Sequence, residues 1–160
     1  MGAGLVGGMG AGGAMAERTA KVESPCGTCG GVLVRQVNQF VFVQDGQLCW
    51  DAEGGCVSCG TGWCEQFGSG ETPEDIRGPL LAEHGPSRLC VTDPVPSLVS
   101  VLKVLREVWE VSLPRARELA GELTDTGLVG TLAEMEFLKI RLRSRGVAAE
   151  VRPAGGPAPW

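Results

Sequence analysis

The amino-acid sequence predicts an α+β fold, in which a small β module is followed by a small α/β sandwich. Six of the seven cysteines lie between residues 26 and 64, among short runs of β-branched and aromatic residues. From residue 97 onward, apolar residues recur instead with the period of an amphipathic helix. The Pro-rich stretch 93–96 lies between these regions and predicts a domain boundary there.

Residues 1–24 are expected to form a disordered, Gly-rich tail, because they hold too few large apolar side chains for a core. The sequence from Met15 onward is typical of a protein start, which leaves open whether residues 1–14 belong to the mature protein. The stretch has neither a basic region nor an unbroken apolar region like those of a signal peptide, and an odd number of cysteines does not suit a disulfide framework. We therefore expect a cytoplasmic protein with reduced cysteines.

The strongest motif is a pair of C-x-x-C-G sequences, which we call the two knuckles. Cys26 and Cys29 form the first, and Cys56 and Cys59 form the second. The two-residue spacer lets both thiolates of a knuckle point at one ion, and the glycine can adopt a positive φ where the chain turns back. Four thiolates close a tetrahedral shell, so the sequence predicts a structural zinc site.

The residues between the knuckles predict two or three short strands. Residues 32–37 and 40–44 are rich in β-branched and aromatic residues, Asp45-Gly46 is a hairpin turn signal, and residues 47–50 continue as the return strand. This plan resembles a zinc ribbon, expected over residues 25–92. Such a module has little core of its own. Zinc binding, worth about 10–16 kcal/mol in small finger peptides, would therefore supply most of its stability.

The remaining candidate metal ligands are three cysteines and the sole histidine. Two interpretations stay open for them. They are either buried small side chains and a helix-end histidine, or a second closed zinc site that brings the number of ligands to eight. The four residues are Cys49, Cys64, His84 and Cys90. The spacing of His84 and Cys90 does not match that of a knuckle.

A short helix is expected within the first module, from about Pro73 to Glu83. Thr72 is the expected N-cap, and Pro73 and two acidic residues suit a first helical turn. The apolar residues expected to face inward are Ile76, Leu80 and Leu81. Residues 89–92 then predict a strand.

The last module, residues 97–152, predicts three helices and a closing strand. The third helix opens with a capping box from Thr131 to Glu134, ends at Gly146 and precedes a strand over residues 147–151. The second helix begins after Ser112 and runs to about residue 119. Residues 153–160 are expected to be a tail. The first helix has an apolar stripe made of Leu98, Val101, Leu102, Leu105, Val108 and Trp109.

This module resembles the C-terminal domain of the acidic stalk protein of the bacterial large ribosomal subunit, the seven/twelve protein. Residues 101–107 (VLKVLRE) and 113–119 (LPRAREL) are similar to that family's V-I-K-x-V-R-x and L-K-E-A-K-x-L, and residues 142–151 are similar to its L-x-x-A-G-A-x-V-E-V ending. The family's G-L-G-L turn is absent, because residues 110–113 read EVSL. The resemblance covers about a third of the chain and implies a compact α/β sandwich.

The resemblance also implies a partner-binding face. In the family, the first two helices present basic residues to translation GTPases, and the matching positions here are Lys103, Arg106 and Arg117. The alternative is that these three residues form an ordinary solvated helix face. Two other lysines of the family are not retained, because the matching positions are Leu98 and Pro114. The three retained cations lead us to expect a translation factor or another ribosome-associated protein as the partner.

Composition and missing motifs narrow the function further. No nucleophile elbow, P-loop or H-E-x-x-H sequence is present, which predicts a non-catalytic protein. Residues 1–90 carry five basic and ten acidic residues, which argues against nucleic acid as the ligand, and no apolar run is long enough to span a membrane. One alternative function is an immunity protein that covers a toxin with an acidic face made of Glu71, Glu74, Asp75 and Glu83. The other alternative, which the charge disfavours, is a zinc ribbon that binds nucleic acid by stacking Trp50 and Trp63 on bases.

Overall fold

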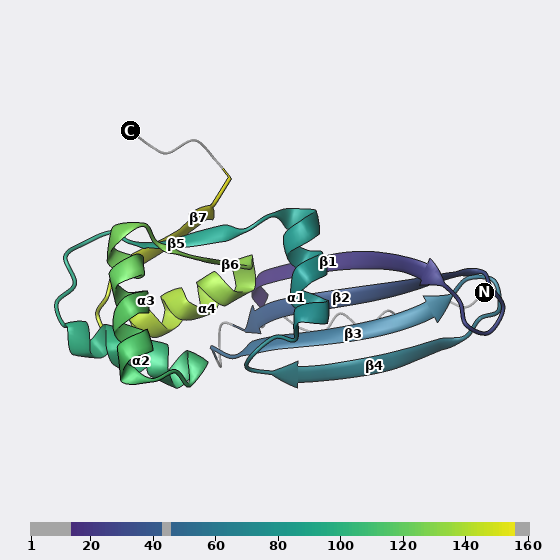
Figure 1. Cartoon of the computed structure of the whole chain (residues 1–160), viewed down its shortest axis with the longest axis horizontal. Helices are drawn as coiled ribbons and strands as arrows, with labels where there is room; N and C mark the ends of the chain where they lie inside the picture. Colours follow the sequence, from purple (N-terminus) through teal and green to yellow (C-terminus); the bar gives the residue numbers. More distant parts are fainter. Residues whose placement is uncertain (1–13, 43–45, 156–160) are drawn as a thin grey trace, which may run out of the picture.

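The computed structural model describes residues 14–42 and 46–155 and places them in two antiparallel sheets and four helices (Figure 1). The expected α+β class is confirmed. The first sheet is a meander of four strands in chain order, with β1 and β4 at its edges. Helix α1 (Glu74–His84) packs on one face of this sheet. The strands are β1 (Ala14–Pro25), β2 (Val32–Phe42), β3 (Leu48–Cys56) and β4 (Gly62–Ser69).

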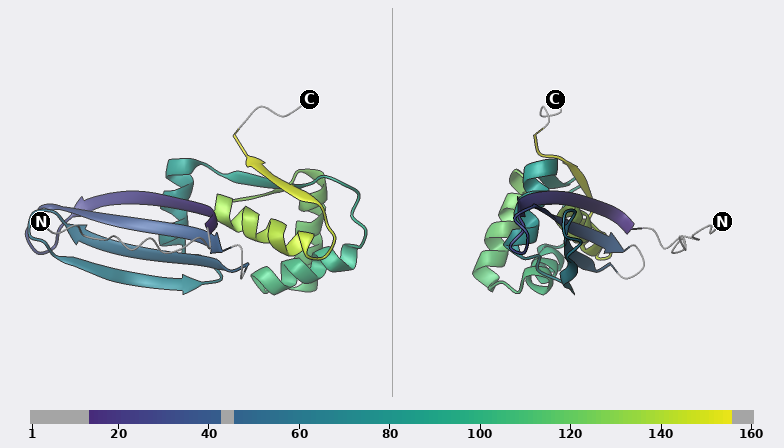
Figure 2. Two further views of the ribbon diagram at one scale, coloured as in Figure 1. Left: turned by 180° about the vertical axis from the view of Figure 1, so that it is seen from behind. Right: turned by 90° about the vertical axis from the view of Figure 1, so that its right-hand side faces the viewer.

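The second sheet has three strands in the order β6-β5-β7; helices α3 and α4 pack against it, and helix α2 packs against α3 and α4 (Figures 1 and 2). The core of this unit is formed by buried side chains from all three strands and from all three helices. In chain order, the elements are β5 (Ser87–Val91), α2 (Leu98–Trp109), α3 (Leu113–Asp125), β6 (Leu128–Gly130), α4 (Leu132–Arg143) and β7 (Ala149–Pro153).

The prediction of a disordered tail up to residue 24 is wrong for residues 14–24. These residues form β1, which pairs with β2 along its whole length, from Ala14 opposite Phe42 to Pro25 opposite Val32. Most described side chains of β1 are exposed, so the strand is fixed by backbone hydrogen bonds more than by burial. Residues 1–13 lie outside the described residues.

The predicted module boundary at residue 92 is also wrong. Ser87–Val91 forms β5, the central strand of the second sheet. The first unit therefore consists of β1 to β4 and α1, and the second unit runs from β5 to β7. The strands of the first sheet are longer than predicted, and β4 extends the sheet beyond the second knuckle. The predicted tail starts too early as well, because Pro153 is the last residue of β7.

The helices largely follow the predicted pattern, with three differences. Pro73, not Thr72, is the N-cap of α1, and no side chain caps this helix. On α2, Val104 is buried, whereas Leu98 at the start of the predicted stripe is 55% exposed. Helix α3 continues to Asp125 because its buried face continues through Leu123. The capping box at the start of α4 is confirmed.

A small apolar core joins the two units at the base of the first sheet. Val41 and Leu48 of β2 and β3 pack there against Ala133 and Phe137 of α4. We call this contact region the seam. The first sheet extends from the seam as an arm, away from helices α2, α3 and α4 (Figures 1 and 2). The base of the arm is the end of the sheet where β2 ends and β3 begins, and the tip is the opposite end. No helix in the described part of the chain has both the length and the apolar character needed to cross a membrane.

Candidate metal centre

The meander topology brings the two knuckles together. The first knuckle is the turn between β1 and β2, and the second is the turn between β3 and β4. In an antiparallel meander the first and third turns lie at the same end of the sheet. Residues that are 27 positions apart, such as Cys29 and Cys56, therefore meet at the tip of the arm.

The two knuckles have the same backbone geometry. In the first, the Cys26 N–H donates to Gly31 O at 2.7 Å and the Gly30 N–H donates to Cys26 O at 2.8 Å. In the second, the Cys56 N–H donates to Thr61 O at 2.7 Å and the Gly60 N–H donates to Cys56 O at 3.0 Å.

The glycine after each knuckle has the role that the sequence predicts. Gly30 and Gly60 both adopt φ of 73°, in the left-handed region that favours glycine. The two turns also approach each other closely, since a Cβ atom on Gly31 would lie 2.6 Å from Ser58 Oγ. Close packing of two matching turns leaves the four sulfur atoms facing one another.

The four knuckle sulfurs form a compact cluster. All four Sγ atoms lie within 4.8 Å of one another, with Cys26 Sγ 3.9 Å from Cys59 Sγ and Cys29 Sγ 3.5 Å from Cys56 Sγ. A tetrahedral ion with metal–sulfur bonds of about 2.3 Å requires sulfur–sulfur distances of about 3.8 Å. The cluster therefore lies at metal-binding distance, and the predicted pairing of the knuckles is present.

The surroundings of the four thiols differ. Cys26 and Cys56 are buried, whereas Cys29 and Cys59 are exposed. A hydrogen bond from the Thr61 hydroxyl, 3.1 Å from Cys59 Sγ, and one from the Thr61 N–H lower the pKa of Cys59 to about 6. Backbone hydrogen bonds from Cys29 and Thr28 likewise lower the pKa of Cys26.

Cys29 shows the opposite behaviour. The Gly31 N–H donates to its sulfur at 3.3 Å and lowers its pKa, but the neighbouring sulfurs, with Cys56 first, and burial outweigh this effect and raise the pKa to about 12. Four crowded sulfurs cannot all be thiolates without a cation between them. A cation between the sulfurs would relieve the repulsion between thiolates and favour loss of their protons.

The other candidate ligands do not join this cluster. Among the described residues, the four knuckle cysteines are the one group of three or more possible ligands at metal-binding distance. Cys49 lies in β3 and Cys90 lies in β5 of the second sheet. His84 Nε2 is 2.7 Å from Thr19 O, at the end of α1. The side chain of Cys64 is outside the described part of the structure.

The predicted partner-binding residues are exposed. Lys103 and Arg106 lie on α2, and Arg117 lies on α3, which packs against α2. Within the described residues, none of the three makes an ion pair, and Arg106 donates only to Val111 O at 3.4 Å. Other arginines of this unit are paired, for example Arg145 with Glu107 at 2.8 Å.

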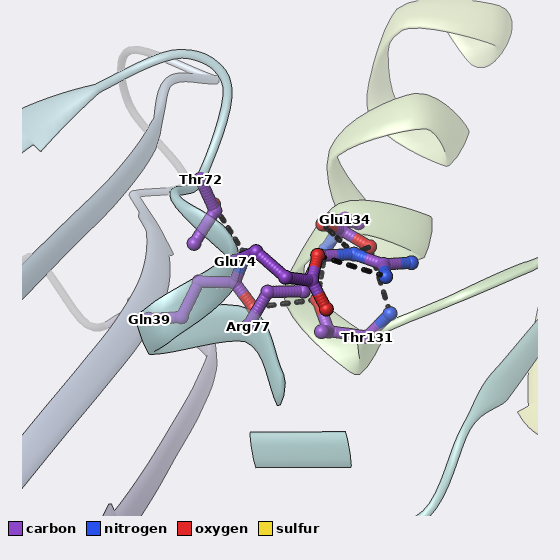
Figure 3. A network of polar contacts seen from close by, with 6 residues as sticks. All are labelled: Gln39, Thr72, Glu74, Arg77, Thr131 and Glu134. Atoms are coloured by element: carbon purple, nitrogen blue, oxygen red, sulfur yellow. Dashed lines mark hydrogen bonds and ion pairs between the residues drawn. The ribbon is translucent and has the colours of Figure 1, made fainter. Parts of the chain in front are cut away.

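Sequence reasoning missed a polar network across the seam (Figure 3). The side chain of Gln39, which is fully buried, donates to Thr72 Oγ1 at 2.7 Å and accepts from Thr131 Oγ1 at 2.5 Å. Arg77 Nε donates to both carboxylate oxygens of Glu134 at 2.9 and 3.2 Å. The sequence feature that could have pointed to this network is the capping box of α4, because its two members also bind the first unit. Thr131 donates to Gln39, and Glu134 pairs with Arg77.

The fold and the cluster define an α+β chain with a possible metal site formed by four cysteines. No protein-family model and no curated protein matches the sequence.

Proposed function

We propose that this chain is a non-catalytic, cytoplasmic zinc-binding protein that acts by binding a translation factor or another ribosome-associated protein. The observation that carries the proposal is the set of exposed cations on α2 and α3 without a carboxylate partner among the described residues, namely Lys103, Arg106 and Arg117.

Zinc is the ion that suits the cluster best. Four sulfur ligands favour a soft or borderline ion, and tetrahedral all-sulfur sites are typical of structural zinc. Cys26, Cys29, Cys56 and Cys59 would hold the ion and fill its coordination shell, which leaves no position for a substrate or a reactive water. Zinc bound here would stabilise the tip of the arm, and the partner would bind elsewhere, on the surface of α2 and α3.

The surface of α2 and α3 has the composition of a protein interface. Beside the unpaired cations, Leu98 and Val99 at the start of α2 are 55% and 59% exposed. Cations next to exposed apolar side chains suit an amphipathic, acidic surface on a partner. The order helix, helix, strand, helix, strand from α2 to β7 is also the order that the resemblance to the stalk protein implies, which supports the proposal.

The test is a charge reversal at two of the three positions. We expect Lys103→Glu combined with Arg117→Glu to abolish capture of the partner from a cell lysate, because both side chains would repel the acidic surface. The control is Arg18→Glu combined with Arg143→Glu, which changes the net charge equally at exposed positions elsewhere. Circular dichroism checks that both variants fold. An identical set of captured proteins for both variants would refute the proposal.

The second candidate function is an immunity protein that neutralises a toxin. It is supported by the exposure of all four acidic residues of the expected face. Asp75, however, already accepts hydrogen bonds from Arg35 at 2.7 Å and from Gln66 at 3.1 Å, so it is less available to a partner than Glu71. Co-expression with the product of a neighbouring toxin gene would test this function, and survival of the cells would favour it over the first.

A further inference from the structure

A groove of about 570 Å³ lies along the seam, on the surface that joins the two units. The loop after β4 and the start of α1 form one wall, and the end of α2 and one side of α4 form the other. A groove of this size between two packed units is a common place for a ligand.

The floor and one wall of the groove are apolar. Leu48, Met135 and Phe137 are buried beneath it, and Val108 and Trp109 at the end of α2 are half-buried beside it. The guanidinium of Arg141 lies 5.3 Å from the centre of the Phe137 ring, so a cation already stacks on an aromatic ring at this place. The groove therefore suits a ligand with an apolar part.

The rim of the groove is acidic. Four carboxylates line it, but only two arginines do. Arg77 is engaged by Glu134 at 2.9 Å and reaches Glu74 only at 3.8 Å (Figure 3). The Glu74 side chain is 78% exposed, and Glu71 has no ion-pair partner within the described residues. Glu107 is paired with Arg145 at 2.8 Å, so Glu71 and Glu74 are the rim carboxylates that remain available to a ligand.

We propose that the seam groove binds a basic segment of a partner polypeptide, in which an apolar side chain stands beside arginine or lysine. The apolar side chain would fill the floor, and the cation would pair with Glu71 and Glu74. Nucleic acids and anionic membranes are repelled by this rim, and a simple polyamine has no group for the floor. The site is separate from the cationic surface of α2 and α3, so this inference goes beyond the proposed function.

The test uses the full chain loaded with zinc and a short, blocked, fluorescent peptide of alternating leucine and arginine. Fluorescence anisotropy measures its dissociation constant. We expect Glu71→Gln combined with Glu74→Gln to weaken binding about tenfold, the effect of losing two exposed ion pairs. The control, Glu17→Gln combined with Glu23→Gln, changes the net charge equally on β1 and should change the constant less than about twofold.

Two further measurements locate the binding and its apolar part. Replacing leucine by serine in the peptide should weaken binding by a similar factor, and spermine should compete poorly. The indole N–H resonance of Trp109, assigned with Trp109→Phe, should shift when the peptide binds. No binding of the leucine–arginine peptide, equal losses in the two double variants, or equal affinity for the serine peptide would each overturn the proposal.

Discussion

At the scale of single residues, Gln39 shows how much one polar side chain can fix. It is fully buried, and its amide group bonds to Thr72 before α1 and to Thr131 at the start of α4. A buried amide is tolerated only when its hydrogen bonds are made, so this side chain selects one arrangement of the two units.

Replacing this amide should therefore be costly. We expect Gln39→Leu to lower the free energy of unfolding by about 2 kcal/mol, because two buried hydroxyls lose their partner. Chemical denaturation measures the change. Gln36→Leu, a half-buried position on the same strand, is the matched control and should have little effect. Equal losses in the two variants would show that the network does not matter.

The knuckle thiols should differ in reactivity once the metal is removed. Because Cys59 has its pKa lowered to about 6 and Cys29 has its pKa raised to about 12, Cys59 is mainly a thiolate at pH 7, whereas Cys29 keeps its proton. We expect iodoacetamide to label Cys59 before Cys29 at pH 7, and the rate at Cys59 to fall as the pH is lowered through 6. Peptide mass spectrometry measures the labelling.

The hydroxyl of Thr61 provides the control for this difference. Thr61→Val removes the hydrogen bond to Cys59 Sγ and should slow the labelling of Cys59 at pH 7. Equal labelling of Cys29 and Cys59 in the unmodified chain would contradict the prediction.

At the scale of elements, the sequence predicted the central hairpin of the first sheet but not its edge strands. β2 and β3 hold buried residues such as Val37 and Ala52, which create a readable pattern. β1 and β4 lie at the edges, and their described side chains are mostly exposed, so apolar alternation is weak there. Propensity alone cannot show that such polar stretches complete a sheet. The clustering of the four knuckle cysteines could be predicted, because the two-residue spacing within each knuckle is a local property of the sequence.

At the scale of elements, we also expect the tip of the arm to depend on a bound metal ion. The buried aliphatic side chains of the arm lie toward its base, whereas Val22 and Val32 near the tip are 37% and 46% exposed. We expect a chelator to increase amide hydrogen exchange in residues 22–36 and 52–64 but not in residues 98–151. Mass spectrometry of peptides measures the exchange, and the metal-loaded chain is the reference. Unchanged exchange at the tip would contradict a structural role for the ion.

At the scale of the whole molecule, the seam was beyond prediction because contacts such as Gln39 with Thr131 join residues 92 positions apart. Helix α4 shows the reason. Met135, Leu138 and Leu142 face the core of the second unit, while Ala133 and Phe137 face the seam. A helix buried on two sides has no single apolar stripe, so its sequence does not reveal a second neighbour.

The seam should make the two units unfold together. We expect Phe137→Ala to lower the free energy of unfolding by about 3 kcal/mol, the usual cost of emptying a buried phenylalanine site. We also expect the tryptophan fluorescence and circular dichroism transitions, coincident in the unmodified chain, to separate. Phe67→Ala is the control, since Phe67 is 81% exposed. Coincident transitions in both variants would show that the seam is not what couples the units.

The arm also sets a distance between surfaces. The 11 residues of β2 span roughly 35 Å from the knuckles at one end to the seam at the other. The helices α2 and α3 lie beyond the seam, on the side away from the tip (Figure 1). The structure therefore holds the four-cysteine cluster and the exposed cations of α2 and α3 at opposite ends of the molecule (Figure 1).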